Sequence, residues 1–172
     1  MLLPPDPRYL IDTCAIGDLE GISPATAYTA DAAVKERVWG GIERLARDGR
    51  MATVYAAKEE IKRRCPNVLA RLEALPAFFL SDTPALMAEV ANVFAASPDW
   101  QRKIQRQKPN RDPADPYLVA MATLTGFVVV TTEKHRNDRT PNNRTGDRIP
   151  DVCQRRGVAW HYLTDFVRVE NL

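Results

Sequence analysis

The residues best able to do chemistry in this sequence are acids at the ends of apolar segments or the starts of helical ones. Asp12 follows the apolar run YLI, Glu59 and Glu60 come shortly after MATVY, Asp115 opens DPYLVAMA, and Glu133 follows FVVVTT. Burying or half-burying an ionised carboxylate costs free energy unless it is paired, hydrogen-bonded or bound to a metal ion. We therefore expect these acids to have partners.

A divalent cation is the partner that a group of such acids favours. Two carboxylates about 4 Å apart repel each other by roughly 4 kcal/mol at an effective dielectric constant of about 20. The candidate ligands are hard oxygen donors, and the chain has only two histidines, His135 and His161, so Mg²⁺ or Mn²⁺ fits better than zinc or copper. His135 fits a loop or substrate contact better than a metal ligand.

Each acid also has a purely structural explanation. Asp115 before Pro116 is a good N-cap with proline at the first helical position, and Asp112 before Pro113 offers the same arrangement. Asp12 could cap a helix after the first strand, and the glutamates could be solvated surface charges. These explanations account for single acids but do not predict that the acids meet at one place.

The elements that must position the acids are apolar strands alternating with helices. Alternation of this kind is typical of a parallel sheet covered on both faces, and we predict a three-layer α/β/α sandwich with a mainly parallel central sheet. Strands are expected at 8–12, 51–55, 127–132 and 158–163, with a further short strand near 77–80. Helices are expected at 31–48, 56–64, 67–75, 83–94, 115–125 and near 149–157.

Ligands of such sheets gather at the carboxyl ends of the strands, where all these acids should lie. Helical spacing places Glu60 on the same face as Ile61, whereas Glu59 projects with Lys62. Glu60 is therefore the preferred inward-facing acid, with Glu59 as the alternative. Asp151, near the start of the short helix at 149–157, is a fifth candidate.

The whole chain fits one domain spanning residues 1–172. Its 172 residues are 45% apolar and 27% charged, which suits a globular protein with a full core. MLLPPDPR does not resemble a signal peptide and no apolar run reaches about 18 residues, so we expect a cytoplasmic protein without membrane contact. Three widely spaced cysteines argue against a disulfide framework.

Five segments of the sequence resemble PIN-domain nucleases: YLIDTCAI, KEEIKR, DPYLVAMA, FVVVTTEK and IPDVCQRRGV. The resemblance covers nearly the whole chain and implies a metal-dependent endoribonuclease similar to VapC-type toxins, encoded beside an antitoxin. It implies that Asp12, Glu60, Asp115 and Glu133 are catalytic metal ligands, with Asp151 as a fifth acid that helps to hold the metal. Thr131 would act as a hydroxyl that supports these ligands.

Metal-activated water would then hydrolyse an RNA phosphodiester bond. Cys14 stands where VapC-type toxins often carry a polar residue, and the last acid, Glu133, is a glutamate rather than an aspartate. The longer side chain leaves occupancy by one or two metal ions open. The RNA, its cleavage site, the antitoxin and the oligomeric state, a homodimer included, also stay open.

Basic residues are concentrated in 101–111 and 134–148, although the net charge is only +2. In a nuclease these residues would contact phosphates along the RNA strand; a solvated loop without function is the alternative. The candidates are Arg102, Lys103, Arg106, Lys108, Arg111, Lys134, Arg136, Arg139, Arg144 and Arg148.

Four other classes of function can be compared with this one. A non-catalytic RNA-binding module would keep the basic residues but would not need the acids, while an RNA-processing enzyme or a structure-specific DNA nuclease of the PIN type would share the acidic site. A haloacid-dehalogenase-like phosphatase needs a second aspartate two residues after the first, where this chain has Cys14. The acids also do not follow the pattern of a receiver domain.

Overall fold

Five parallel strands form the centre of the protein, in the order β3-β2-β1-β4-β5. The computed structural model describes residues 7–21, 31–106, 113–143 and 146–172. The strands are β1 (Tyr9–Ile11), β2 (Met51–Val54), β3 (Phe79–Leu80), β4 (Val128–Thr131) and β5 (Trp160–Tyr162). In the central pairing, Tyr9 is in register with Val128 and Ile11 with Val130.

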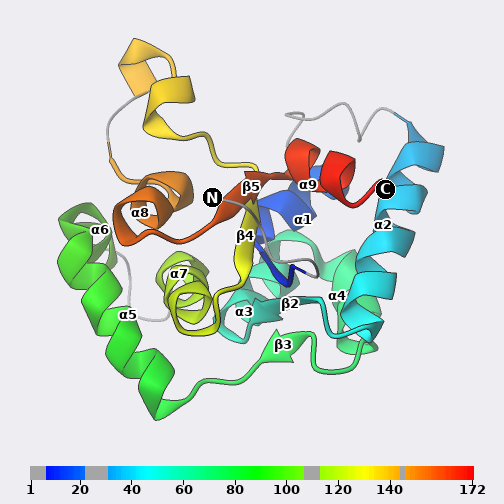
Figure 1. Ribbon diagram of the computed structural model, residues 1–172, viewed down its shortest axis with the longest axis horizontal. Coiled ribbons are helices and arrows are strands. Elements are labelled where there is room, and N and C mark those ends of the chain that lie inside the picture. Colours follow the sequence, from blue (N-terminus) through cyan, green and yellow to red (C-terminus); the bar gives the residue numbers. More distant parts are fainter. Residues whose placement is uncertain (1–6, 22–30, 107–112, 144–145) are drawn as a thin grey trace.

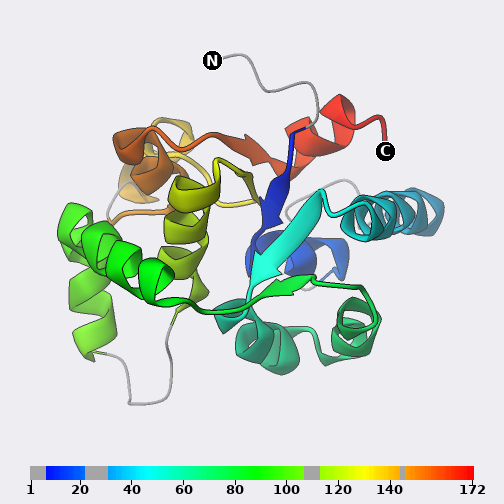
Figure 2. The same ribbon diagram turned by 60° about the horizontal axis from the view of Figure 1, so that its bottom comes forward.

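Helices cover both faces of this sheet (Figures 1 and 2), so the predicted three-layer α/β/α fold is confirmed. Figure 2 shows α5, α6, α7 and α8 on one side and α1, α2 and α9 on the other. The helices are α1 (Thr13–Leu19), α2 (Ala32–Arg47), α3 (Ala56–Arg64), α4 (Pro66–Glu73), α5 (Pro84–Ala96), α6 (Pro98–Arg106), α7 (Ala114–Thr125), α8 (Ile149–Arg156) and α9 (Leu163–Val169), with the 3-10 turns η2 (Arg136–Asp138) and η3 (Pro141–Asn143).

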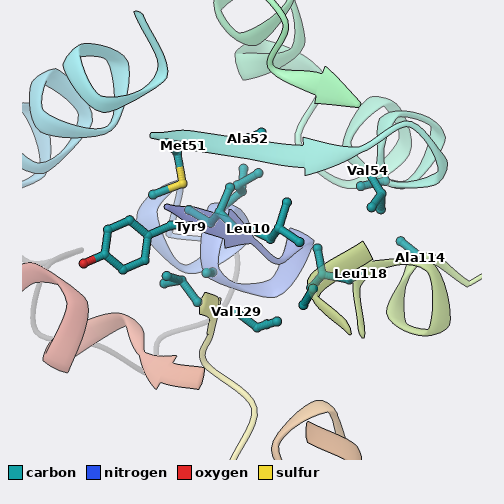
Figure 3. Close-up of a cluster of buried hydrophobic side chains, with 14 of the residues drawn as sticks. Tyr9, Leu10, Met51, Ala52, Val54, Ala114, Leu118 and Val129 are labelled. Atoms are coloured by element: carbon teal, nitrogen blue, oxygen red, sulfur yellow. The ribbon is translucent and has the colours of Figure 1, made fainter. Parts of the chain in front are cut away.

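The core forms because the strands are apolar on both sides. Tyr9, Leu10 and Ile11 of β1 are fully buried, as a strand between two helical layers must be. Figure 3 shows Tyr9 and Leu10 in a cluster of buried side chains that come also from β2, from β4 and, with Leu118, from α7. The hydroxyl of Tyr9 donates a hydrogen bond to Glu170 Oε1 at 2.7 Å, so its one polar atom is satisfied.

Three helices differ from the prediction. The helix α5 ends at Ala96, near its expected end, but a separate helix, α6, begins at Pro98 and was not predicted. Proline at the first helical position loses no hydrogen bond, so Pro98 can start a helix. The short α9 directly follows β5 and was not predicted. The helix α1 begins at Thr13, immediately after Asp12, and was expected only as a consequence of Asp12 acting as a cap.

The described helices include none that is both long enough and apolar enough to span a membrane.

Candidate active site

A cleft of about 300 Å³ lies at the carboxyl end of the sheet. Figure 2 shows β1 and β2 pointing toward this end, where α3 and the start of α7 are found. Three acids from different elements meet in the cleft wall: Glu60 of α3, Asp115 of α7, and Glu133 just after β4. The other lining residues are Cys14, Arg64, Trp100, Pro113, Pro116 and Arg148.

The fourth predicted acid, Asp12, is buried beside the cleft, with 2% of its surface exposed. It follows β1 directly, and its backbone N–H donates to the carbonyl of Val130 in β4 at 2.9 Å. Its Oδ2 accepts a hydrogen bond of 2.8 Å from the hydroxyl of Thr131. That hydroxyl in turn accepts from the backbone N–H of Glu133 at 3.1 Å. Thr131 thus fixes two of the acids relative to each other.

Burial and neighbouring charges together raise the pKa of Asp12 to about 7, from an ordinary value of 3.8. Burial is the larger cause, followed by the charge of Glu133 and, to a lesser extent, that of Glu60; the Thr131 hydroxyl and the Cys14 amide act in the opposite direction. The Asp12 side chain does not cap α1. The negative charge of this site is therefore only partly compensated.

The structure distinguishes the two glutamates of α3. Glu60 lines the cleft, whereas Glu59 is exposed and is not part of the lining. The two side chains differ because Glu60 lies one position before the buried Ile61, which faces the core. Glu60 is thus the member of the pair placed to act with the other acids.

Asp115 does not cap its helix, so the explanation of this residue as an N-cap is wrong. The N-cap position of α7 is taken by Pro113, and Asp115 lies in the first turn of the helix. A carboxylate in the first turn is favoured by the helix dipole, so this position costs little. Its place in the cleft wall still requires an explanation other than capping.

Glu133 is held by the start of α8. Its Oε1 accepts from Arg148 Nη1 at 3.1 Å, and its Oε2 accepts from the backbone N–H of Ile149 at 2.9 Å. The first contact is a salt bridge, in which 13% of the Glu133 side chain and 41% of the Arg148 side chain are exposed. Arg148 therefore neutralises one of the cleft acids in this structure.

Asp151, the fifth predicted acid, is placed differently: it anchors the loop between β4 and α8. It is 5% exposed and accepts from the backbone N–H groups of Arg136 at 2.7 Å and Arg148 at 2.9 Å. It also forms a salt bridge with Arg139, which is itself only 6% exposed. The structure does not bring Asp151 to the cleft, and the burial of Arg139 corrects its prediction as a phosphate contact.

The other basic residues predicted to contact RNA phosphates lie in different parts of the structure. Arg148 lines the cleft. Lys134 is exposed and directly follows Glu133 in the sequence. Arg136 forms a salt bridge with Asp147, in which its Nη2 lies 3.5 Å from Oδ1. Arg102 pairs with Asp99 in α6, to which Lys103 and Arg106 also belong. Lys108, Arg111 and Arg144 lie outside the described residues.

Sequence reasoning did not assign a role to Arg64 or Trp100, although both line the cleft. Arg64 stands four residues after Glu60, one helical turn, and this spacing was the signal that could have identified it. Trp100 is 4% exposed, and its indole N–H donates to the carbonyl of Asp147 at 3.1 Å, which joins α6 to the loop before α8. Tertiary contacts of this kind have no signal in the sequence.

Cys14 lines the cleft, and its surroundings disfavour the thiolate form. The charge of Asp12 is the largest cause that raises its pKa, followed by burial and the charges of Glu133 and Asp115. A thiol is a nucleophile only as the thiolate. The surroundings of Cys14 therefore do not favour its use as a nucleophile.

The donor set fits a hard divalent cation, but its arrangement is incomplete. Among the described residues, no three His, Cys, Asp or Glu side chains are grouped closely enough to hold a metal ion. Three carboxylates nevertheless line one cleft, and a fourth is buried beside it with a raised pKa. The carboxylate of Glu133 is directed to Arg148, so a cation would have to replace that guanidinium.

Comparison with known families gives one match: a family described as "Domain of unknown function (DUF4411)" matches residues 9–172. No curated protein matches the chain. The family description names no activity, so the function must be argued from the cleft.

Proposed function

This chain belongs to the DUF4411 family, and from its acidic cleft we propose that it is a metal-dependent endoribonuclease. One observation carries the proposal: Glu60, Asp115 and Glu133, which are far apart in the sequence, line a single cleft beside the buried Asp12. Structural roles for single acids do not require such a meeting. The resemblance of the surrounding sequence motifs to PIN-domain nucleases supports the same reaction.

Asp12, Glu60, Asp115 and Glu133 are the residues that would hold Mg²⁺ or Mn²⁺, because all four offer hard oxygen ligands. When bound, the ion would supply a more acidic water and positive charge at the phosphate. The positive charge of the ion would offset the carboxylate repulsion that, together with burial, raises the pKa of Asp12.

The other cleft residues have supporting tasks. Thr131 holds the Asp12 carboxylate through its 2.8 Å hydrogen bond and so fixes its orientation. Arg148, once displaced from Glu133 by the ion, would have a guanidinium available for an RNA phosphate, and guanidinium and phosphate groups match in shape and charge. Trp100, Pro113 and Pro116 form rigid apolar parts of the wall.

The direct test is incubation of the purified protein with single-stranded RNA in Mn²⁺, in Mg²⁺ and in excess chelator. Cleavage should require the added metal and should stop with chelator. Equal cleavage in chelator would reject the metal-dependent mechanism. Binding of RNA without cleavage under any of these conditions would favour a non-catalytic RNA-binding module.

A role as the toxin of a toxin–antitoxin pair rests on the sequence resemblance. Expression of the chain alone should then arrest bacterial growth, and Asp12→Asn should relieve the arrest at equal protein level. A wild type that is well expressed and harmless would favour RNA processing instead. Co-purification with the product of the adjacent gene would test for the antitoxin partner.

A further inference from the structure

Two arginines line the acidic cleft, and they come from different elements. Arg148 precedes α8 and is paired with Glu133. Arg64 is the last residue of α3, the helix that also carries Glu60. An arginine in the wall of a negatively charged cleft would ordinarily pair with one of the carboxylates.

Arg64 is not held in this way. In the part of the chain that the structure describes, no carboxylate lies within salt-bridge distance of its guanidinium, whereas Arg50 and Arg71, for example, pair with Glu170 and Glu43. The polar contact of Arg64 is Cys14 Sγ, 3.7 Å from Nη1. A thiol sulfur is a weak acceptor, so this contact uses little of the hydrogen-bonding capacity of the guanidinium.

The position of Arg64 also makes it accessible. The residue is exposed, although it lines the cleft, which places its guanidinium where a ligand from solution can reach it. A cation at the C-terminus of a helix is favoured by the helix dipole, and this alone would explain an arginine at the end of α3. It would explain Arg63 equally well, yet only Arg64 lines the cleft.

We propose that Arg64 is a substrate-binding residue that holds a phosphodiester group of single-stranded RNA at the cleft. The inference rests on the proposed nuclease function, to which it adds a specific contact. Guanidinium binds phosphate through paired hydrogen bonds, and a strand entering a cleft of carboxylates needs compensating positive charge. Arg64 and Arg148 supply that charge from two separate elements, so together they fix the strand at two points.

The experiment measures binding without cleavage. Fluorescence anisotropy of a short labelled single-stranded RNA is recorded with Ca²⁺ in place of Mg²⁺, over a range of salt concentrations, for wild type, Arg64→Gln and Arg63→Gln. Arg63 is the matched control, because it has the same charge, is exposed on the same helix and is absent from the cleft lining. Arg64→Lys tests whether charge alone suffices.

Arg64→Gln should weaken binding about tenfold and reduce the dependence of log K on log salt by about one unit, as expected for one lost phosphate contact. Arg64→Lys should keep the salt dependence and recover part of the affinity, while Arg63→Gln should stay close to wild type. Equal effects of Arg63→Gln and Arg64→Gln, or wild-type binding by Arg64→Gln, would overturn the proposal for Arg64. Failure of wild type to cleave RNA with Mg²⁺ or Mn²⁺ would instead contradict the nuclease function.

Discussion

The hydroxyl of Thr131 donates a 2.8 Å hydrogen bond to Oδ2 of Asp12, and this bond joins the ends of the adjacent strands β1 and β4. Both residues are almost fully buried. The same hydroxyl accepts from the backbone N–H of Glu133. One small side chain therefore controls both the position and the charge of the buried acid.

Replacing Thr131 by valine should lower the free energy of unfolding and change the pH dependence of RNA cleavage. The loss of a buried hydrogen bond costs about 1–3 kcal/mol of the free energy of unfolding, measurable by urea denaturation. The Thr131 bond lowers the pKa of Asp12, so its removal should raise that pKa and move the onset of metal-dependent cleavage to higher pH. Thr131→Ser keeps the hydroxyl and is the control; identical pH profiles for Thr131→Val and wild type would contradict this role.

The raised pKa of Asp12 predicts how stability depends on pH in chelator. The folded protein holds this proton up to about pH 7, whereas the unfolded chain releases it near the ordinary value of 3.8. The contribution of Asp12 is therefore fully present below about pH 4 and is lost as the pH rises through about 7. Asp12→Asn should gain stability relative to wild type across this range, by on the order of a few kcal/mol, in urea titrations at several pH values. A constant difference between the two proteins would contradict the shift.

Arg148→Gln should affect metal and RNA in opposite directions. The substitution removes the cation that neutralises Glu133, so Mn²⁺ should bind more tightly in calorimetry, by roughly three- to tenfold. RNA should bind more weakly, because a phosphate contact is lost. Arg168→Gln is the control, since Arg168 is an exposed arginine of α9 paired with Asp165. Weaker metal binding by Arg148→Gln would show that Arg148 does not compete with the ion.

Asp115→Asn should separate metal binding from folding. Because Asp115 does not cap α7, the variant should keep or slightly increase its stability in chelator through reduced carboxylate repulsion. Wild type should gain about 2.7 kcal/mol at a metal concentration 100 times its dissociation constant, and the variant should lose most of this gain in thermal melts. Asp99→Asn, in the first turn of α6, should behave as wild type. A full metal response in Asp115→Asn would remove Asp115 from the ligand set.

The parallel sheet and its acidic edge could be predicted because both follow from local patterns. Apolar strands such as YLI and VVVT need helices on both faces, and the carboxyl ends of parallel strands must meet at one edge. The preference for Glu60 over Glu59 as the inward-facing acid followed from the position of Ile61 in the same helix. These inferences needed only neighbours in the sequence.

The features that escaped prediction depend on contacts between distant residues. The loop before α8 is fixed by Asp151 and by Asp147, which accepts from Ser97 at 2.7 Å across 50 residues. Arg139 is buried in this loop. The sequence around Arg139 does not distinguish it from the exposed basic residues nearby. The capping role considered for Asp115 failed because α7 begins at Ala114, with Pro113 at the N-cap position, so Asp115 already lies inside the helix.

The measurement that tests the central claim most directly is the rate of RNA cleavage by Glu60→Gln and Glu59→Gln in Mn²⁺. The two residues are adjacent in α3, and the substitutions remove the same charge, but only Glu60 lines the cleft. If the acids at the carboxyl edge form the catalytic site, Glu60→Gln should lose at least about a hundredfold in rate, on the order of 3 kcal/mol of transition-state stabilisation. Glu59→Gln should stay within a few-fold of wild type. Equal activity of both variants, or a loss confined to Glu59→Gln, would contradict a catalytic role for this cleft.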